Sequence, residues 1–568
     1  MKQIALWAAA CVLAGGLMGA ERVRVDSHVA VKMRDGVILY ADVYRPDRGG
    51  QFPVIVIRTP YGTQREGTHA DCFRFAEQGY VVVNQDVRGR FESDGKWVPF
   101  FDEGKDGYDT IEWAAKQPWS NGKVGSQGGS YLGNNQWLAG AEAPPHLKAM
   151  FPRVASTSIY HNWAYFGGAY RLSFNFGWGV VRMPFRIMQP QSWHTEKYVP
   201  EEMKYAQVLR GAPLGEMDLK SSHTVVAHYR DWLKHESYDA YWKGASVEDR
   251  FDKIQAPAHT LGGWWDIFVA GTINGYVGMK GKGARMVIGP WGHGPSRKFG
   301  EQDFGPGAMR SSFDYELRWF NHWLKGEQNG VDKEPPVEIF YMGANQWRKE
   351  KDWPLPGTQY KALYLAEGKT LQFEKPAATG NFSYVADPAN PVPTLGGNNC
   401  CGSPTVAGPV DQRPIESRPD VLSYTSAALT EAVTIAGPVK MKLQASTDGK
   451  DTDWMVKLVD VAPNGYAMNL AEGILRARFR EGLTKAKLLE PGKTYEFEVD
   501  MVGTANVFQP GHRIRVDIMS SNFPQFSVNP NTGEPLATAG VGRKAKNTVF
   551  HGGATASAII LPVVAALP

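Results

Sequence analysis

The first 345 residues alternate between short apolar runs and segments in which apolar residues recur with helical spacing. The runs Pro53–Arg58, Gly79–Asp86 and Ala284–Pro290 have the length and β-branched content of buried strands. The spacing within Asp106–Lys116 and Tyr315–Lys325 predicts helices. Because alternating strands and helices are typical of a parallel sheet covered by helices, this part of the chain predicts an α/β domain.

Two parts of the chain depart from this pattern. Between residues 156 and 254 clear strands are lacking, and an aromatic-rich stretch is followed by charged segments of helical character, which predicts a cap inserted into the sheet domain. From residue 346 short β-rich runs are separated by Gly, Pro, Asn and Asp, which predicts a β-sandwich or jelly roll. The clearest of these runs are Val439–Leu443, Trp454–Val459, Tyr495–Met501 and Arg513–Met519.

The N-terminus has the pattern of an export signal. Lys2 precedes the apolar run Ile4–Met18, and Ala20 is a small residue at a plausible cleavage point. The run is shorter than the ~20 residues of a membrane helix, so we predict cleavage after residue 20 and no stable membrane insertion. A lipoprotein signal at Cys11 is less favoured, because Ala8 stands where such signals usually carry Leu. The predicted location is periplasmic or secreted.

Composition excludes several classes of protein. The 568 residues exceed the ~150 typical of one domain, and 43% hydrophobic with 12% aromatic residues exclude a disordered or fibrous chain. The net charge is +4 without a dense basic run, so we expect no nucleic-acid partner. Without the predicted signal three cysteines remain, Cys72, Cys400 and Cys401, and an odd count is no disulfide framework. Stability is therefore expected mainly from packing, and the oxidation state of the adjacent pair stays open.

The candidate chemistry is concentrated in Lys123–Gly133 (KVGSQGGSYLG). A glycine turn followed by the helix-compatible stretch Tyr131–Ala139 predicts a strand-to-helix elbow, with the Ser130 hydroxyl exposed beside the positive end of the helix. The strict G-x-S-x-G pattern is not met, because Leu132 occupies its last position. Taken alone, the segment is therefore also compatible with an ordinary Gly/Ser-rich loop.

A nucleophilic serine needs a base and an orienting acid, which in this type of fold follow in the order Ser, Asp/Glu, His. Asp266 follows the mostly apolar run Leu261–Trp265, and His293 lies in a glycine-flanked loop after the strand Met286–Ile288. Of the later histidines, His322 lies within a predicted helix and the others belong to the β-rich tail. Asp266 and His293 are thus the candidates, although a strand-end aspartate and a solvated loop histidine are the simpler interpretations.

These residues lie within motifs that resemble the X-Pro dipeptidyl-peptidase/cocaine esterase family of serine hydrolases, which includes the glutaryl acylases and the α-amino-acid ester hydrolases. The resemblance extends over nearly the whole mature chain, and the family pattern G-x-S-Y-x-G accommodates Leu132. The motifs are Thr59-Pro60-Tyr61, Asp86–Arg90, Trp119–Gly125, Gly128–Gly133, Trp264-Trp265-Asp266, Gly289–His293, Pro393–Gly397, Asp411-Gln412-Arg413 and Ser520–Pro524.

The resemblance implies an α/β-hydrolase core with a helical cap insertion and a C-terminal β jelly-roll domain. We predict a signal peptide in residues 1–20, the core in 21–155 and 255–345, the cap in 156–254 and the jelly roll in 346–568. Asp86, Arg88 and Arg90 match the family and are expected to form a structural charge network near the site.

The resemblance also implies roles for the site residues. Ser130 would attack an ester or amide carbonyl, His293 would take its proton, and Asp266 would orient the imidazole. The backbone amide of Tyr131 and the phenol of Tyr61 would hold the oxyanion. This chemistry needs no metal or organic cofactor. The acidic residues Asp448, Asp451 and Asp453 are expected to form a solvated turn, not a calcium site.

The substrate is predicted only as a class. By resemblance Trp163 and Phe268 belong to the acyl pocket, although a core role is nearly as compatible with two aromatic residues. Family members that select a free α-amino group carry carboxylates just beyond the catalytic Asp, whereas Ile267, Phe268 and Val269 follow Asp266 here. This predicts a small-molecule ester or amide with a neutral acyl group. The alternatives are an X-Pro dipeptidyl peptidase and, from another class, an inactive secreted binding protein that uses its β domain; homo-oligomerisation stays open.

Overall fold

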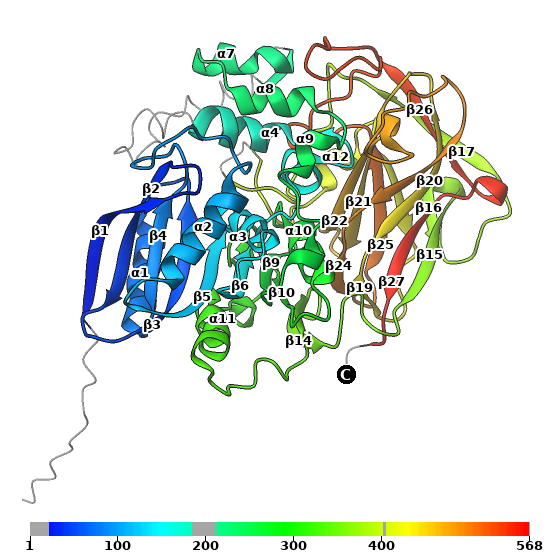
Figure 1. The fold of residues 1–568 in the computed structure, drawn as a ribbon. Coiled ribbons are helices and arrows are strands. Elements are labelled where there is room, and N and C mark those ends of the chain that lie inside the picture. The colour runs from blue at the N-terminus through cyan, green and yellow to red at the C-terminus, as the bar shows by residue number, and fades with distance from the viewer. Residues whose placement is uncertain (1–21, 184–208, 211–212, 402–404, 567–568) are drawn as a thin grey trace, which may run out of the picture.

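The computed structural model describes residues 22–183, 209–210, 213–401 and 405–566, so the predicted signal peptide lies outside the described residues. Two large sheets stand side by side (Figure 1). The first has ten strands. In spatial order they are β1 (Val23–Lys32), β2 (Ile38–Pro46), β4 (Val81–Asp86), β3 (Phe52–Thr59), β5 (Ser120–Gly129), β6 (Leu147–Arg153), β9 (His259–Gly263), β10 (Arg285–Gly289), β13 (Val337–Tyr341) and β14 (Gln346–Glu350).

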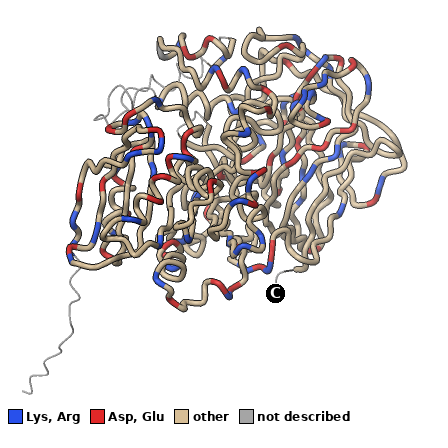
Figure 2. The backbone as a smooth tube through the Cα atoms, viewed as in Figure 1, with Lys and Arg blue, Asp and Glu red and all other residues tan. Residues whose placement is uncertain are grey.

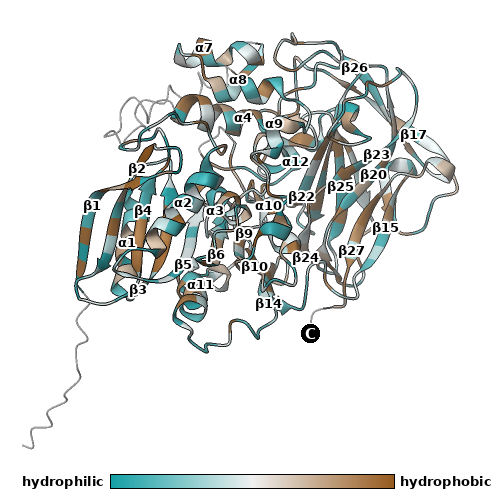
Figure 3. Ribbon diagram, viewed as in Figure 1, coloured by the Kyte–Doolittle hydropathy of each residue, from teal (hydrophilic) through white to brown (hydrophobic). Residues whose placement is uncertain are grey.

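The centre of this sheet, from β4 to β13, is parallel, whereas β1, β2 and β14 pair in the antiparallel sense at its edges. Strands β3, β4, β9 and β10 are buried along their whole length. Burial on both faces explains the apolar runs of β3, β10 and the first half of β4, whereas Asn84, Gln85 and Asp86 at the end of β4 are polar and buried (Figure 3). The helices between the strands are α1 (Glu66–Glu77), α2 (Glu103–Ala115), α3 (Tyr131–Ala141), α10 (Val269–Gly278) and α11 (Ser312–Phe320).

This arrangement confirms the predicted α/β-hydrolase core. The strands expected from periodicity correspond to β3, β4 and β10, and the expected helices correspond to α2 and to α11, which η7 (Asn321–Lys325) continues. One boundary differs. Strand β14 pairs with β13, so the first sheet extends to Glu350, past the position 345 at which we ended the core.

The described part of the chain between β6 and β9 consists largely of short helical segments, several of which lie at the top of Figure 1. They are η1 (Ile159–Ala164), α4 (Leu172–Asn175), η2 (Phe176–Arg182), η4 (Leu214–Glu216), α7 (Met217–Ser222), α8 (Ala227–Lys234), α9 (Ala240–Lys243) and η5 (Phe251–Lys253). A short hairpin, β7 (Tyr165–Phe166) with β8 (Ala169–Tyr170), is the only strand pairing in the described part of this insertion. Most of the aromatic residues that made this stretch conspicuous are buried, Trp163 and Tyr165 completely, whereas Phe166 is half-buried.

The C-terminal part is β-rich, with a thirteen-stranded, mostly antiparallel sheet that curves onto itself. Its strands are β15 (Gln359–Ala366), β16 (Thr370–Gln372), β17 (Gly380–Ala386), β18 (Leu422–Ser426), β19 (Val433–Gly437), β20 (Lys440–Thr447), β21 (Asp453–Val461), β22 (Ala467–Arg476), β23 (Tyr495–Asp500), β24 (Thr504–Phe508), β25 (Arg513–Met519), β26 (Ala545–His551) and β27 (Ala558–Val563). The four strongest β runs of the sequence lie in β20, β21, β23 and β25. Alternating burial in β23 shows one face on the core and one in solvent.

Charged residues of both signs are interspersed along the backbone (Figure 2). Among the described residues, none of the helices combines the length and hydropathy needed to cross a bilayer.

Candidate active site

Ser130 lies at the turn between β5 and α3, where the chain reverses sharply above the sheet. Its backbone has φ 61° and ψ −126°, a conformation that non-glycine residues rarely adopt. The turn is fixed on both sides: the Ser130 amide donates to the carbonyl of Arg153 at 2.9 Å, and the Ser130 carbonyl accepts from Asn134 at 3.0 Å. This is the strained elbow expected for a serine whose hydroxyl is presented to substrate.

Two glycines of the motif are explained by close packing around the elbow. A Cβ on Gly128 would lie 2.5 Å from the Cβ of Leu132, and Gly128 itself has φ 141°. A Cβ on Gly133 would lie 2.5 Å from the Cβ of Ala155 and 3.1 Å from the Arg153 carbonyl oxygen. The second glycine thus lets the first turn of α3 lie directly against the chain after β6, which explains physically why Gly133 is needed one residue after Leu132.

Asp266 and His293 are brought together by the neighbouring parallel strands β9 and β10. Asp266 follows β9 and is fully buried, and His293 follows β10 with 23% of its side chain exposed. The imidazole Nδ1 lies 2.8 Å from Asp266 Oδ1. A carboxylate in this position accepts the Nδ1 proton, so Nε2 is left as the basic nitrogen.

Ser130 and His293 line the same pocket, whose volume is about 600 Å³. The pocket is also lined by Gln127, Arg153 and Trp291. Among the described residues no hydrogen bond joins the Ser130 hydroxyl to His293. In serine hydrolases this contact is often long before substrate binds. The nucleophile, base and acid predicted from the sequence thus converge at one edge of the sheet.

Tyr131 contributes a backbone amide at the start of α3, while its phenol is held by other residues. The amide is the first N–H of α3 and has no backbone acceptor among the described residues. The phenol donates to Glu103 Oε1 at 2.8 Å and accepts from the Trp97 indole at 3.1 Å. Burial and the Glu103 carboxylate raise the pKa of the phenol well above its usual range, so it remains a donor. The side chain therefore anchors the helix N-terminus at which an oxyanion would bind.

Tyr61 lies beside Tyr131, with the two rings edge to face at 6.4 Å. Its hydroxyl oxygen accepts a hydrogen bond from the indole of Trp178, in the cap, at 3.1 Å. Because this bond occupies an oxygen lone pair, the hydroxyl hydrogen of Tyr61 is directed away from Trp178. The guanidinium of Arg65 lies 4.9 Å from the ring centroid. Tyr61 is thus a positioned donor whose orientation depends on the cap.

Trp163 and Phe268 form one wall beside His293. Their rings stack at 4.8 Å, and Phe268 contacts the His293 ring edge to face at 5.6 Å. Both side chains are completely buried. Trp163 also packs against Phe174 and Trp178, so the wall continues into the cap. Of the two predicted pocket residues, Phe268 thus touches His293 and Trp163 lies behind it, and neither is among the residues that line the pocket of Ser130 and His293.

The apolar residues on either side of Phe268 do not share its position. Ile267 and Val269 line a separate cavity of only about 10 Å³, together with Arg171 and Glu472. The apolar run that was expected to favour a neutral acyl group is therefore not one surface, since Ile267 and Val269 line this cavity whereas Phe268 packs against His293. The cap residues Glu201 and Glu202, which could have supplied a carboxylate, lie outside the described residues.

The residues Asp86, Arg88 and Arg90, predicted to form one charge network, have separate surroundings in the structure. Arg88 pairs with Asp106 at 2.6 Å and Asp35 at 2.7 Å, and buried Arg90 donates to the carbonyl of Pro60 next to Tyr61. Burial raises the pKa of Asp86 to about 8. The acidic residues of the β domain were expected in a solvated turn, but Asp451 and Asp453 are buried and only Asp448 is exposed. Asp451 pairs with Arg478, Asp453 with Arg476 and Asp448 with Arg543.

Two features of the site were missed in the sequence. The side-chain amide of Asn398, in the β-rich domain, donates to the carbonyls of Trp264 at 2.9 Å and Asp266 at 3.1 Å. Two residues later begins a disulfide between the adjacent Cys400 and Cys401. Such a bridge closes no chain loop, so the expectation that packing dominates stability still holds. The adjacent cysteines were the only signal in the sequence.

Comparison with the sequences of known proteins places the chain among serine hydrolases. The family model described as X-Pro dipeptidyl-peptidase (S15 family) matches residues 35–295. That of the X-Pro dipeptidyl-peptidase C-terminal non-catalytic domain matches residues 329–560. The chain belongs to this family. It is 36% identical to the cocaine esterase of Rhodococcus sp. (strain MB1 Bresler) over 573 residues, which cover 95% of this chain and 98% of the esterase.

Solved structures of this family have the same architecture. An aminopeptidase from a marine sediment Thaumarchaeota archaeon is 28% identical and superposes with a TM-score of 0.85, covering 96% of this chain and 97% of its own. An α-amino acid ester hydrolase is 27% identical with a TM-score of 0.83, covering 98% and 100%. The chain is therefore a serine hydrolase with esterase or peptidase activity that acts on small molecules, and the alternative of an inactive binding protein is set aside.

Proposed function

We propose that the chain is an esterase or acylase that forms an acyl-enzyme on Ser130 and prefers neutral acyl groups. His293 takes the proton of the Ser130 hydroxyl, and Asp266 holds its Nδ1 and stabilises the imidazolium. The observation that carries this proposal is the 2.8 Å contact between His293 and Asp266 in the pocket that Ser130 lines. The Tyr131 amide and the Tyr61 hydroxyl act as oxyanion donors, each contributing about 3 kcal/mol in the transition state.

The preference for neutral acyl groups rests on the aromatic cluster around Phe268. Phe268 contacts the catalytic histidine, and Trp163, Phe174 and Trp178, which carry no formal charge, pack behind it. Two carboxylates lie near, and both are engaged: Glu103 by the Tyr131 phenol, and Asp71, which lines the Ser130 pocket, by Arg74. An ammonium ion placed in such a cluster would be desolvated without a partner, at a cost on the order of several kcal/mol. The name of the Rhodococcus relative, cocaine esterase, agrees with ester hydrolysis.

The second candidate is an X-Pro dipeptidyl peptidase or aminopeptidase. It is favoured by the description of the family and by the archaeal aminopeptidase among the structural relatives. Dipeptidyl peptidases and aminopeptidases both need a counter-ion for the free amine of the substrate. The choice between these peptidases and an esterase therefore depends on whether the acyl pocket supplies one.

The assignment of the nucleophile is tested with a fluorophosphonate probe, which labels only an activated serine. Wild-type protein should be labelled and Ser130→Ala should not, while circular dichroism of the two proteins stays the same. Ser296→Ala is the matched control, because the Ser296 hydroxyl donates to the Lys298 carbonyl in the loop that carries His293. Labelling of Ser130→Ala protein would refute the triad.

The acyl preference is tested by comparing kcat/KM for a phenylacetyl ester with that for the α-amino ester of the same acid, at a pH where the amine is protonated. The neutral ester should be favoured at least about tenfold, equivalent to about 1.4 kcal/mol. Trp163→Leu should lower kcat/KM for the aryl ester more than for an acetyl ester with the same leaving group. A preference for the amino ester would favour the peptidase.

We further propose that the chain is exported after cleavage at residue 20. The charged, apolar and small-residue pattern of the N-terminus supports this proposal. N-terminal sequencing of protein from fractionated cells should begin at Glu21, and an intact Met1 in the cytoplasmic fraction would contradict export.

A further inference from the structure

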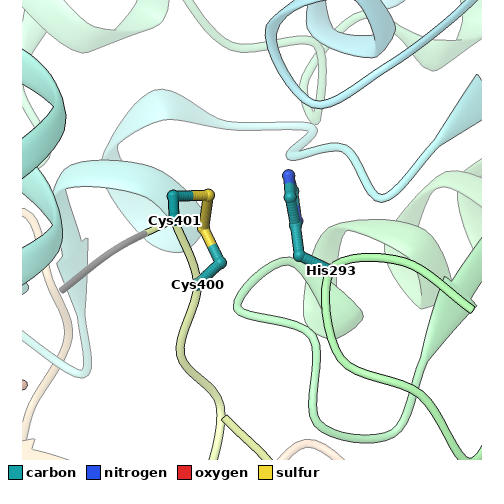
Figure 4. A group of neighbouring side chains, drawn as sticks. All are labelled: His293, Cys400 and Cys401. Carbon is teal, nitrogen blue, oxygen red and sulfur yellow. A yellow bond between two sulfur atoms is a disulfide. The ribbon is translucent and has the colours of Figure 1, made fainter. Parts of the chain in front are cut away.

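The Cys400–Cys401 disulfide lies beside the imidazole of His293 (Figure 4). One ligand atom of each residue, a ring nitrogen and the two Sγ atoms, lies within 4.8 Å of the others. Within the described residues this is the one group of three His, Cys, Asp or Glu side chains with atoms so close. Two sulfurs and an imidazole are the donor set that zinc and other thiophilic cations prefer.

The position of the two cysteines does not depend on the bond between them. Asn398 ties their loop to the Asp266 turn through two hydrogen bonds, and its amide N–H donates to Glu472 at 2.9 Å. Asn399 closes the loop onto the Gly396 carbonyl at 2.7 Å. Because the disulfide joins adjacent residues, opening it releases no chain segment. The two thiols formed by reduction would therefore remain next to His293.

His293 is already arranged as metal-binding histidines usually are. Its Nδ1 is engaged by the buried carboxylate of Asp266 at 2.8 Å. A carboxylate on one ring nitrogen fixes the tautomer and raises the basicity of the other, which then binds the cation. The free nitrogen, Nε2, is the one that the proposed mechanism uses as base.

The distances suit one small cation after reduction. Zn–S bonds of about 2.3 Å and a Zn–N bond of about 2.0 Å place tetrahedral ligands about 3.8 Å (S to S) and about 3.5 Å (S to N) apart. The sulfurs must separate from the bonded state, and the histidine nitrogen, within 4.8 Å of them, must approach by at most about 1.3 Å. Both changes are within reach of side-chain rotation.

We propose that, in the dithiol state, Cys400, Cys401 and His293 form a binding site for a thiophilic divalent cation, represented by Zn²⁺, that removes His293 from catalysis. A trialkylphosphine and water reduce the disulfide to two thiols and yield the phosphine oxide. Zn²⁺ then binds two thiolates and Nε2, with water as the fourth ligand, and the two thiol protons pass to solvent. Inhibition rests on the proposed role of His293, whereas binding does not.

Binding is measured on Ser130→Ala protein, so the result does not depend on turnover. The protein is reduced with a trialkylphosphine, the reductant is removed without oxygen, and bound zinc is measured after equilibrium dialysis. Thiol titration must show two more thiols per chain than in the oxidised protein. Reduced protein should bind one zinc ion per chain and oxidised protein none.

Variants locate the site. Cys401→Ser and His293→Gln, each in the reduced Ser130→Ala background, should weaken zinc binding at least about tenfold. Cys72→Ala is the matched control, since it removes a buried thiol of α1 and should leave binding unchanged. If Cys401→Ser does not fold, reduced protein alkylated at its accessible thiols replaces it. Reduced protein that gains two thiols and binds no zinc overturns the proposal, as does binding that survives both variants.

The activity measurement is separate. Reduced wild-type enzyme should lose ester hydrolysis in zinc and regain it with a chelator, whereas oxidised enzyme should be unaffected. Zinc that binds through Cys401 and His293 but does not inhibit would support the metal site and contradict the role of His293 as base.

Discussion

Replacing Ser130 by glycine should make the protein more stable than replacing it by alanine. Ser130 is held at φ 61° and ψ −126°, where a Cβ is disfavoured and glycine is not. Relief of such strain is worth about 1–3 kcal/mol. Glycine also increases the entropy of the unfolded chain, which costs about 0.4–1 kcal/mol. The difference predicts that Ser130→Gly exceeds Ser130→Ala by about 1 kcal/mol in free energy of unfolding.

Both variants lack the hydroxyl, so the comparison isolates the backbone. Unfolding in urea, followed by circular dichroism, gives the difference from the shift in midpoint at constant slope. Ser126, in the same strand β5, is the control because its φ is not positive. There the glycine variant should be the less stable by about 0.5–1 kcal/mol. A Ser130→Gly protein no more stable than Ser130→Ala would refute the inference that the elbow stores strain.

The remaining predictions concern the surroundings of the site. Asn398→Ala removes two hydrogen bonds from the Asp266 turn and should lower kcat about tenfold or more, with KM little changed; an unaltered kcat would show that the β domain does not position the acid. Gly133→Ala should destabilise the protein by about 1–3 kcal/mol, against the usual helix preference for alanine, because its Cβ would lie 2.5 Å from Ala155; a gain in stability contradicts this packing. Burial lowers the pKa of His228 to about 4. As the pH falls from 6.5 to 4, the unfolded chain therefore binds more protons than the folded chain, and the free energy of unfolding decreases by up to about 3 kcal/mol. His228→Gln should flatten this part of the stability profile, and an unchanged slope would assign it to other groups.

Periodicity predicted the elements that position the site, because these signals are local. Strands β3 and β4 are buried on both faces, so their apolar runs are continuous and short. The elbow at Ser130 was readable because a tight strand-to-helix turn needs glycines at fixed offsets. The order of Ser130, Asp266 and His293 follows from the topology of the fold. For these residues the sequence contained both the element and its chemistry.

Side-chain direction within a turn could not be read in this way. Ile267, Phe268 and Val269 form one apolar run, yet only Phe268 packs against His293. The backbone of the turn decides this, and composition carries no information about it. The sequence therefore predicted three apolar residues on the acyl side of the site, whereas in the structure only one of them, Phe268, lies beside His293.

The amino-acid sequence by itself determined the α/β core and the elbow, and it singled out Ser130, His293 and Asp266 as the candidate nucleophile, base and acid, since each depends on contacts within a few residues or on a fixed order of strands. Only the tertiary structure decided what surrounds them. The cap reaches Tyr61 through Trp178, and the β-rich domain reaches Asp266 through Asn398 and His293 through the Cys400–Cys401 disulfide. These contacts join segments more than a hundred residues apart in most cases, and no local pattern of polar and apolar positions specifies which distant segment will fold against which.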